Sequence, residues 1–170
     1  MNYLNVNSVD EDNYSGSYES HRFEQYKIYL EMTDRISSRR QSANSFFVTI
    51  NTLLITLAAY ATAEANRDTF FSIVISLSGA LTCYIWYRLI LSYKNLNSAK
   101  FKVIHAIEKS LPYRLFDAEW DAVGRGANKK LYQPFTHLEM WVPWIFLAIH
   151  VLVFLYVLIW VELLHSCVQP

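Results

Sequence analysis

Two uncharged apolar segments, joined by a short polar turn, constrain this chain more than any other feature. Residues 46–63 and 69–87 contain no Asp, Glu, Lys or Arg, and only residues 64–68 separate them. About 20 apolar residues in a helix cross the roughly 30 Å hydrocarbon core of a bilayer. Because lipid offers the backbone no hydrogen bonds, such segments must form helices. A third apolar segment, residues 141–161, is interrupted only by His150. The sequence therefore predicts an all-α, polytopic membrane protein with three transmembrane helices.

Composition narrows the class of protein further. The chain of 170 residues carries 15 basic and 15 acidic residues, so its formal net charge is zero. No basic field favours a nucleic-acid partner, and none is predicted. The opening residues are polar and show no secretory signal, so the first span is expected to direct membrane insertion. Cys83 lies in a predicted span and Cys167 near the C-terminus, so no disulfide is expected between them.

The pattern divides the chain into seven predicted segments. They are a flexible N-terminal tail (1–20), a cytoplasmic helix leading into the first span (21–44), transmembrane helix 1 (45–64), transmembrane helix 2 (69–93), a cytoplasmic helical segment (94–140), transmembrane helix 3 (141–163) and a periplasmic C-terminal tail (164–170). The N-terminal tail lacks the apolar periodicity that would offset the entropy of ordering it. Docking of this tail on a neighbouring subunit is the alternative.

Helical periodicity extends beyond the first two spans. Phe23, Tyr26 and Leu30 recur at spacings of three and four residues, and the apolar residues of 96–107 do the same before Pro112. These cytoplasmic extensions need a surface against which to bury their apolar faces. We therefore predict a compact cytoplasmic bundle and side-by-side packing of subunits into a homo-oligomer.

The remaining cytoplasmic segment contains start and stop signals. A short amphipathic helix is predicted from about Asp117, and the Gly-Arg-Gly sequence at 124–126 is expected to end it. Thr136 and Glu139 have the spacing of a capping box, which would start the third long helix. Pro143 is then expected either in the first turn of that helix or at a kink.

Basic residues near the span ends predict the orientation. One side of the membrane would hold several cations, and the other side Arg67 alone. The positive-inside rule then places the N-terminus in the cytoplasm and the C-terminus in the periplasm. The residues proposed to set this topology, and alternatively to bind anionic lipid head groups, are Arg35, Arg39, Arg40, Arg88 and Lys94.

Small and polar residues form stripes along the first two spans. The predicted interface or pore-lining residues are Thr49, Asn51, Thr52, Thr56, Ser72, Ser76 and Gly79. Small residues allow helix backbones to approach closely, which favours a helix–helix interface within or between subunits. The alternative is that one stripe lines a water-filled pore in an oligomer. Asn51 needs a partner for its amide, and symmetry mates in a ring are one source of it.

The third span has a different character. It is rich in Leu, Ile, Val and Phe and lacks a small-residue stripe, which indicates a lipid-facing surface. Trp141, Trp144 and Trp160 lie near its ends and are predicted to be interfacial anchors.

No catalytic or cofactor-binding pattern is recognisable. The five histidines show neither the paired spacing of a metalloprotease nor a cysteine partner for zinc. His150, alone within a predicted span, is a functional candidate because intramembrane ionisable residues are rare. The alternative is a neutral imidazole bonded to a neighbouring helix. We predict no enzyme activity, no catalytic residue, no metal and no cofactor.

Three segments carry a resemblance to a known family. They are YKIYLEMTDRISSRRQSANS followed by FFVTIN, then WYRLILSYKNLNSAKFKVIHAIEKSLP, and finally Glu139 with Pro143 at the start of the last span. These segments resemble the RipA family of small bacterial inner-membrane proteins, described as octameric. The resemblance implies a Gram-negative inner membrane and a ring-like homo-oligomer, and it supplies no catalytic residue. The arginine-rich hairpin also resembles SLATT-type two-span proteins, from which the third span departs.

The predicted function is a scaffolding or membrane-organising role for a homo-oligomer, which the resemblance implies is an octamer. The alternative is a channel or pore-like effector lined by the first or second span. The expected partners are membrane lipids and further copies of the chain, and the sequence names no other protein.

Overall fold

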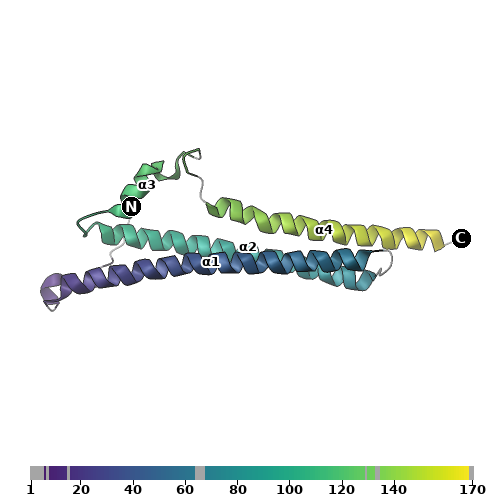
Figure 1. The fold of residues 1–170 in the computed structure, drawn as a ribbon, viewed down its shortest axis with the longest axis horizontal. Helices are drawn as coiled ribbons and strands as arrows, with labels where there is room; N and C mark the ends of the chain where they lie inside the picture. The colour runs from purple at the N-terminus through teal and green to yellow at the C-terminus, as the bar shows by residue number, and fades with distance from the viewer. Residues whose placement is uncertain are drawn as a thin grey trace. The chain divides into compact units, whose positions relative to one another are not determined.

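The computed structural model describes residues 6, 8–14, 16–63, 68–128, 130–132 and 135–168. Four α-helices make up most of this part of the chain (Figure 1): α1 (Tyr18–Thr62), α2 (Thr69–Glu108), α3 (Leu115–Ala122) and α4 (Phe135–Val168). Two short 3₁₀ turns, η1 (Glu11–Asn13) and η3 (Gly124–Gly126), complete it, and no strand occurs among these residues. Three helices are long and apolar enough to cross a membrane. The predicted all-α class with three spans is confirmed.

The chain divides into two compact units. One, the polar unit, comprises Met1–Arg40 and Ser92–Phe135, and the other, the membrane unit, comprises Gln41–Leu91 and Thr136–Pro170. Helices α1 and α2 contribute to both units without interruption. Neither helix contains proline, and α1 contains no glycine, so nothing in the sequence breaks the hydrogen-bond ladder at the boundary.

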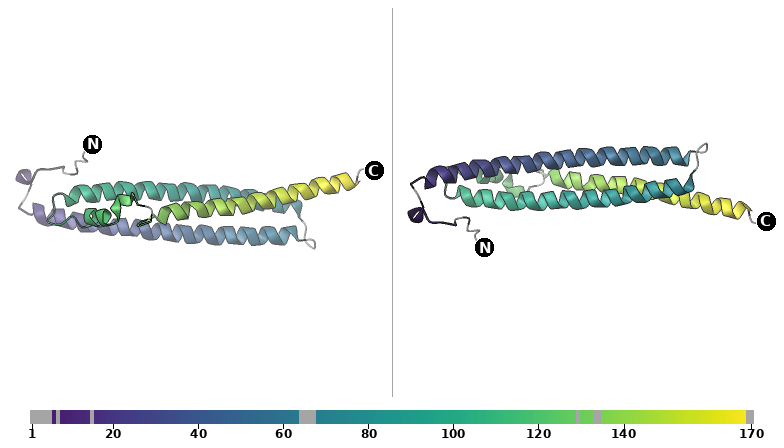
Figure 2. Two further views of the ribbon diagram at one scale, coloured as in Figure 1. Left: turned by 90° about the horizontal axis from the view of Figure 1, so that it is seen from above. Right: turned by 90° about the horizontal axis from the view of Figure 1, so that it is seen from below.

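In the membrane unit three helical segments run side by side (Figures 1 and 2). Asn44 and Asn51 of α1 contact Trp86 and Cys83 of α2, in that order, so α1 and α2 are antiparallel. The same two asparagines contact α4 at Glu139 and then at a residue further along, so α4 runs parallel to α1. Small and branched side chains fill the space between the helices, among them Ala58, Ala61, Ile75 and Val157.

Glu108 organises the polar unit. Its side chain is fully buried. One carboxylate oxygen accepts hydrogen bonds from the Tyr26 hydroxyl at 3.4 Å and the Phe116 amide at 2.9 Å, and the other accepts from the Asp117 amide at 3.1 Å. Burial and the nearby Glu108 carboxylate raise the pKa of Tyr26, so the phenol stays protonated and donates. Glu108 therefore joins α1, the end of α2 and the start of α3.

This carboxylate also explains where α3 begins. The residue before the helix, Arg114, makes no capping hydrogen bond with its side chain. Glu108 supplies the acceptor from a distance in sequence, and α3 starts at Leu115, slightly before the predicted start near Asp117. The predicted stop is confirmed, because three successive residues at 124–126 have positive φ angles of 67°, 50° and 73°.

The capping box predicted for the start of α4 is wrong. The helix already begins at Phe135, so Thr136 lies inside it and not at its N-cap. Glu139, the other half of the predicted capping box, accepts a hydrogen bond from Asn44 of α1. Pro143 lies beyond the first turn of α4 and is buried.

We expect Glu108→Ala to release α3. The substitution removes an acceptor from two backbone amides and a phenol, and hydrogen bonds to charged groups contribute about 1.5–3 kcal/mol each. Hydrogen exchange at the amides of Phe116 and Asp117 should accelerate. Glu119→Ala, an exposed carboxylate on α3, is the matched control and should leave both amides protected. Equal protection in the two variants would contradict this role of Glu108.

Candidate functional site: a buried polar cluster in the membrane unit

Asn51 lies at the centre of the membrane unit and is completely buried. Its side-chain oxygen is 3.1 Å from Cys83 Sγ on α2 and 3.3 Å from His150 Nε2 on α4. Its side-chain nitrogen donates to the Phe47 carbonyl on α1 at 2.8 Å. One amide thus connects the three helices that are candidates to cross the membrane.

The direction of these hydrogen bonds assigns the protons. Because the Asn51 nitrogen donates to a carbonyl, the Asn51 oxygen faces Cys83 and His150 and can only accept. The Cys83 thiol is therefore the donor on α2, and His150 Nε2 carries the ring proton on α4. His150 Nδ1 then holds a lone pair, and in the described part of the chain it is buried without a hydrogen-bond partner. A proton on Nδ1 would find no acceptor among the described residues, so the arrangement favours a neutral imidazole.

Gly79 makes room for the His150 ring. A Cβ atom at position 79 would overlap the imidazole, so the ring lies directly on the α2 backbone. Ser72 and Ser76 are each 1% exposed on the same face of α2, and their hydroxyls donate to carbonyls of their own helix. The small-residue stripe of the second span thus faces the interior of the subunit, where it allows α4 to approach closely.

A second polar cluster lies nearer the start of α4. The Trp86 indole donates to the Asn44 side-chain oxygen at 2.9 Å, and the Asn44 nitrogen donates to Glu139 at 3.1 Å. Trp86 also stacks on Phe47 with ring centroids 5.7 Å apart. The sequence analysis missed this cluster. Its signal was the spacing of Asn44 and Asn51, which lie two helical turns apart on one face of α1.

The threonines of the first span lie on a different face from Asn51. Thr49, Thr52 and Thr56 are exposed, and each hydroxyl donates to the carbonyl four residues earlier, at 2.8–2.9 Å. This differs from the expectation that Asn51 and the threonines share one role. The hydrogen-bond partners of the Asn51 amide come from the same chain, and not from symmetry mates in a ring.

The predicted basic and aromatic residues are spread over the surface. Arg35 and Arg39 are exposed, Arg40 and Lys94 are half-buried, and Arg88 donates to the Tyr84 hydroxyl at 3.3 Å. Arg67 lies outside the described residues.

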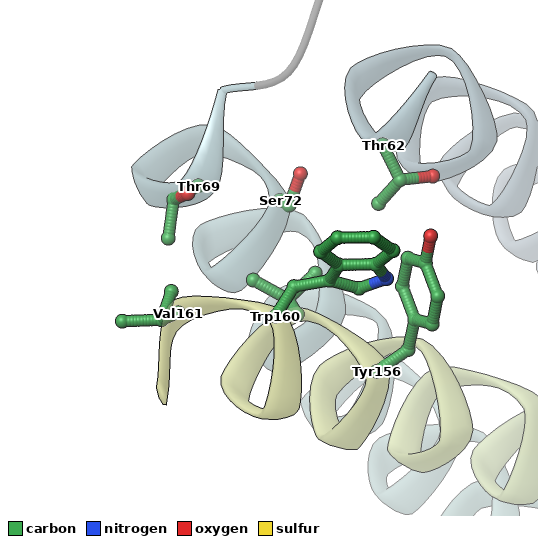
Figure 3. Close-up of a pocket in the computed structure, with 7 residues that line it drawn as sticks. Thr62, Thr69, Ser72, Tyr156, Trp160 and Val161 are labelled. Carbon is green, nitrogen blue, oxygen red and sulfur yellow. The ribbon is translucent and has the colours of Figure 1, made fainter. Parts of the chain in front are cut away.

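The three tryptophans of α4 differ from one another. Trp141 is 68% exposed and Trp144 50% exposed, while Trp160 is half-buried. Trp160 lines a small cavity of about 20 Å³, which is large enough for a single water molecule. Figure 3 shows Trp160 and Tyr156 extending from α4 toward the facing ends of α1 and α2. The cavity is lined by Thr62, Thr69, Ser72, Tyr156, Val157, Trp160 and Val161.

Comparison with known proteins assigns the family. The sequence profile of the octameric membrane protein family (8xMP) matches residues 23–159. The chain belongs to this family. The match contains both polar clusters, from Asn44 to His150, and it confirms the resemblance to octameric membrane proteins of the RipA type. No curated protein and no solved structure matches the chain. This member of the octameric membrane protein family is a membrane protein with three candidate spans.

We expect Gly79→Ala to destabilise the membrane unit. The added methyl group would displace the His150 ring and its bond to Asn51, and overpacking of this kind typically costs about 1–3 kcal/mol. The midpoint of thermal unfolding in detergent should fall. Gly16→Ala is the control, because nothing lies within 4 Å of a Cβ at that position. Equal midpoints for the two variants would show that the contact of His150 with Gly79 does not support the fold.

Proposed function

We propose that this member of the octameric membrane protein family is a homo-octameric scaffold of the bacterial inner membrane. In this role the assembly fixes the arrangement of membrane or partner components and does not conduct ions. One observation carries the proposal: the buried polar groups of the membrane unit bond to one another within the subunit. Asn51 bonds to Cys83 and His150, and Asn44 bonds to Trp86 and Glu139, so these polar groups find partners on other helices of the same subunit.

The exposed face of α1 supports assembly through helix packing. Thr49, Thr52, Thr56, Ala59 and Ala63 are all exposed, and all are small. The threonine hydroxyls already bond to carbonyls of their own helix, which satisfies them without water. Such a face suits a neighbouring helix at close range.

A channel lined by α1 is the second candidate. It is favoured by the exposed threonine hydroxyls, which retain lone pairs able to accept hydrogen bonds from water. The two functions differ in what lies against Thr52 and Thr56, either a helix or an aqueous path.

Orientation and lipid contacts follow from the charges. We propose a cytoplasmic N-terminus and a periplasmic C-terminus, with Arg35, Arg39 and Lys94 on the cytoplasmic side. The exposed Trp141 is proposed to lie at the interface of the same leaflet. Lipid head groups and further copies of the chain are the proposed partners.

A non-enzymatic role is part of the proposal. No group of three or more His, Cys, Asp or Glu side chains that could hold a metal occurs among the described residues. The one cavity described above admits only a water-sized guest. The support for a structural role is that the polar side chains of the membrane unit hold its helices together.

We expect Thr56→Leu to weaken the octamer without creating or abolishing ion flux. The larger side chain would separate helices that pack at this face. Native mass spectrometry in mild detergent should show fewer octamers, and planar bilayers containing the wild-type protein should show no conductance. Ser78→Leu, which introduces the same leucine at an exposed position of α2, is the control and should leave the octamer intact.

Two results would contradict the scaffold. One is a steady conductance of the wild-type octamer that Thr56→Leu blocks, which would establish the channel. The other is a wild-type protein that stays monomeric in nanodiscs, which would remove the assembly altogether.

A further inference from the structure

We propose that neighbouring subunits join through two different faces, a head-to-tail (heterologous) contact. The outer face of α1 of one copy packs against the outer face of α2 of the next. The inference rests on the proposed homo-octamer and names the two surfaces that join its subunits. It is carried by complementary side-chain size in the membrane unit and, independently, by complementary charge in the polar unit.

One row on the outer face of α1 in the membrane unit consists of small residues, with the large exposed side chains of Phe46, Leu53 and Tyr60 beside it. Its members are Ser45, Thr49, Thr52, Thr56 and Ala59, followed by Ala63 directly after the helix, and all of them are exposed. Their spacing alternates between four and three residues, the 3.5-residue period of helices that pack along their whole length with a left-handed twist. The row points away from Asn51, so the contacts inside the subunit do not cover it.

The outer row of α2 has the same spacing but large side chains. Its members are Phe70, Val74, Leu77, Leu81 and Tyr84, which are 78%, 42%, 55%, 60% and 55% exposed, respectively. The row lies on the side of α2 opposite Gly79 and Cys83, which are buried. Large side chains at this period fit between small ones on a facing helix, as knobs into holes.

The two rows lie at the same depth. A ring axis parallel to the membrane normal carries each residue to the same depth in the next copy. Asn51 and Cys83 are in contact inside the subunit and so mark one level. Thr52 follows Asn51 by one residue, and Leu81 precedes Cys83 by two. Because α1 and α2 are antiparallel, both steps lead in the same direction along the membrane normal, so Thr52 and Leu81 lie at nearly the same level. The antiparallel direction of α1 and α2 then keeps the rows level along their whole length.

The polar unit carries opposite charges on its own parts of α1 and α2. Glu24 and Glu31 lie seven residues apart on α1, with Arg35, the ion-pair partner of Glu31, one turn further on. Lys102 lies on α2, and Lys109 follows directly after the end of that helix, also seven residues apart. The two glutamates and the two lysines are exposed. The Tyr26–Glu108 bond marks the level inside this unit. Glu31 follows Tyr26 by five residues on α1, and Lys102 precedes Glu108 by six residues on α2. Because the two helices are antiparallel, Glu31 of one copy and Lys102 of the next oppose each other across the proposed interface.

The acidic residues are available for this contact. Glu24 and Glu31 pair with Lys27 and Arg35 on their own helix, with the carboxylate side chains 61% and 63% exposed. Exposed pairs of this kind contribute little, so a carboxylate can exchange or share its partner.

A second copy of the chain is the occupant that fits both observations. A second copy presents Lys102 opposite Glu31 at the same depth, which gives the charged residues of the polar unit partners of opposite sign. A contact between two different faces also generates a ring when the rotation closes, as an octameric family requires. Anionic lipid at Lys102 and Lys109 is the competing occupant, and the test separates the two.

Exchange of the charges tests the pairing. Glu31→Lys and Lys102→Glu should each lower the ratio of octamer to free subunit about tenfold or more at low ionic strength, because like charges then face each other. The double variant Glu31→Lys/Lys102→Glu should restore the wild-type ratio. Native mass spectrometry in nanodiscs gives the ratio, and Glu119→Lys, the same charge change at an exposed position of α3, should leave it unchanged.

Three outcomes would overturn the inference. In the first, the double variant is as dissociated as the single ones, and in the second, neither single substitution changes the ratio. In the third, Lys102→Glu weakens binding to vesicles containing phosphatidylglycerol while the octamer persists, which would assign Lys102 to lipid. In all three the wild-type octamer remains, so the proposed assembly would survive the loss of the inferred interface.

Disulfide trapping tests the membrane part of the same interface. Thr52→Cys and Leu81→Cys, carried on separate copies in a Cys167→Ser background, should cross-link only when both copies are present. Cys83 is 1% exposed and should not compete. Thr52→Cys paired with Ser78→Cys, which lies off the α2 row, is the control and should not cross-link.

Cross-linking of Thr52→Cys to itself would show that α1 faces converge on each other and would overturn the head-to-tail contact. Absence of any cross-link in a protein that is octameric by mass would do the same. A wild-type protein without an octamer would instead contradict the proposed function itself.

Discussion

The membrane unit depends on one buried amide. Hydrocarbon offers no hydrogen bonds, so a polar side chain placed there must find its partners in the protein. Asn51 finds them on its own helix, at the Phe47 carbonyl, and on the two neighbouring helices, at the Cys83 thiol of α2 and the His150 ring of α4. Because each partner lies on a different segment, the amide fixes the rotation and register of the helices together.

This arrangement assigns different tasks to the two sides of α1. The inner side, with Asn44 and Asn51, holds the subunit together. The outer side, with its exposed threonines and alanines, remains for contacts beyond the subunit. The polar contacts inside the subunit, together with a row of small residues on its outer side, are compatible with the proposed assembly. Membership in the octameric membrane protein family agrees with that reading.

Much of the fold could be predicted from the sequence, because the bilayer makes hydropathy decisive. The segments 46–63, 69–87 and 141–161 had to be helices in lipid, and the structure confirms three helices long enough to span. The face of α1 was harder to assign. Successive residues on a helix differ by about 100°, so Thr49, Asn51 and Thr52 are close in sequence yet point in different directions. The cap that Glu108 provides for α3 and the link from Asn44 to Glu139 were missed because they depend on tertiary contacts, which local patterns do not specify.

The buried position of Asn51 predicts that water does not reach its side-chain amide in the assembled protein. The most direct measurement is hydrogen–deuterium exchange of the Asn51 side-chain amide, followed by NMR in the wild-type octamer reconstituted in nanodiscs. The buried geometry predicts slow exchange, comparable to the backbone amides of the surrounding helices. Exchange as fast as that of an exposed asparagine would place Asn51 beside water and would contradict this prediction.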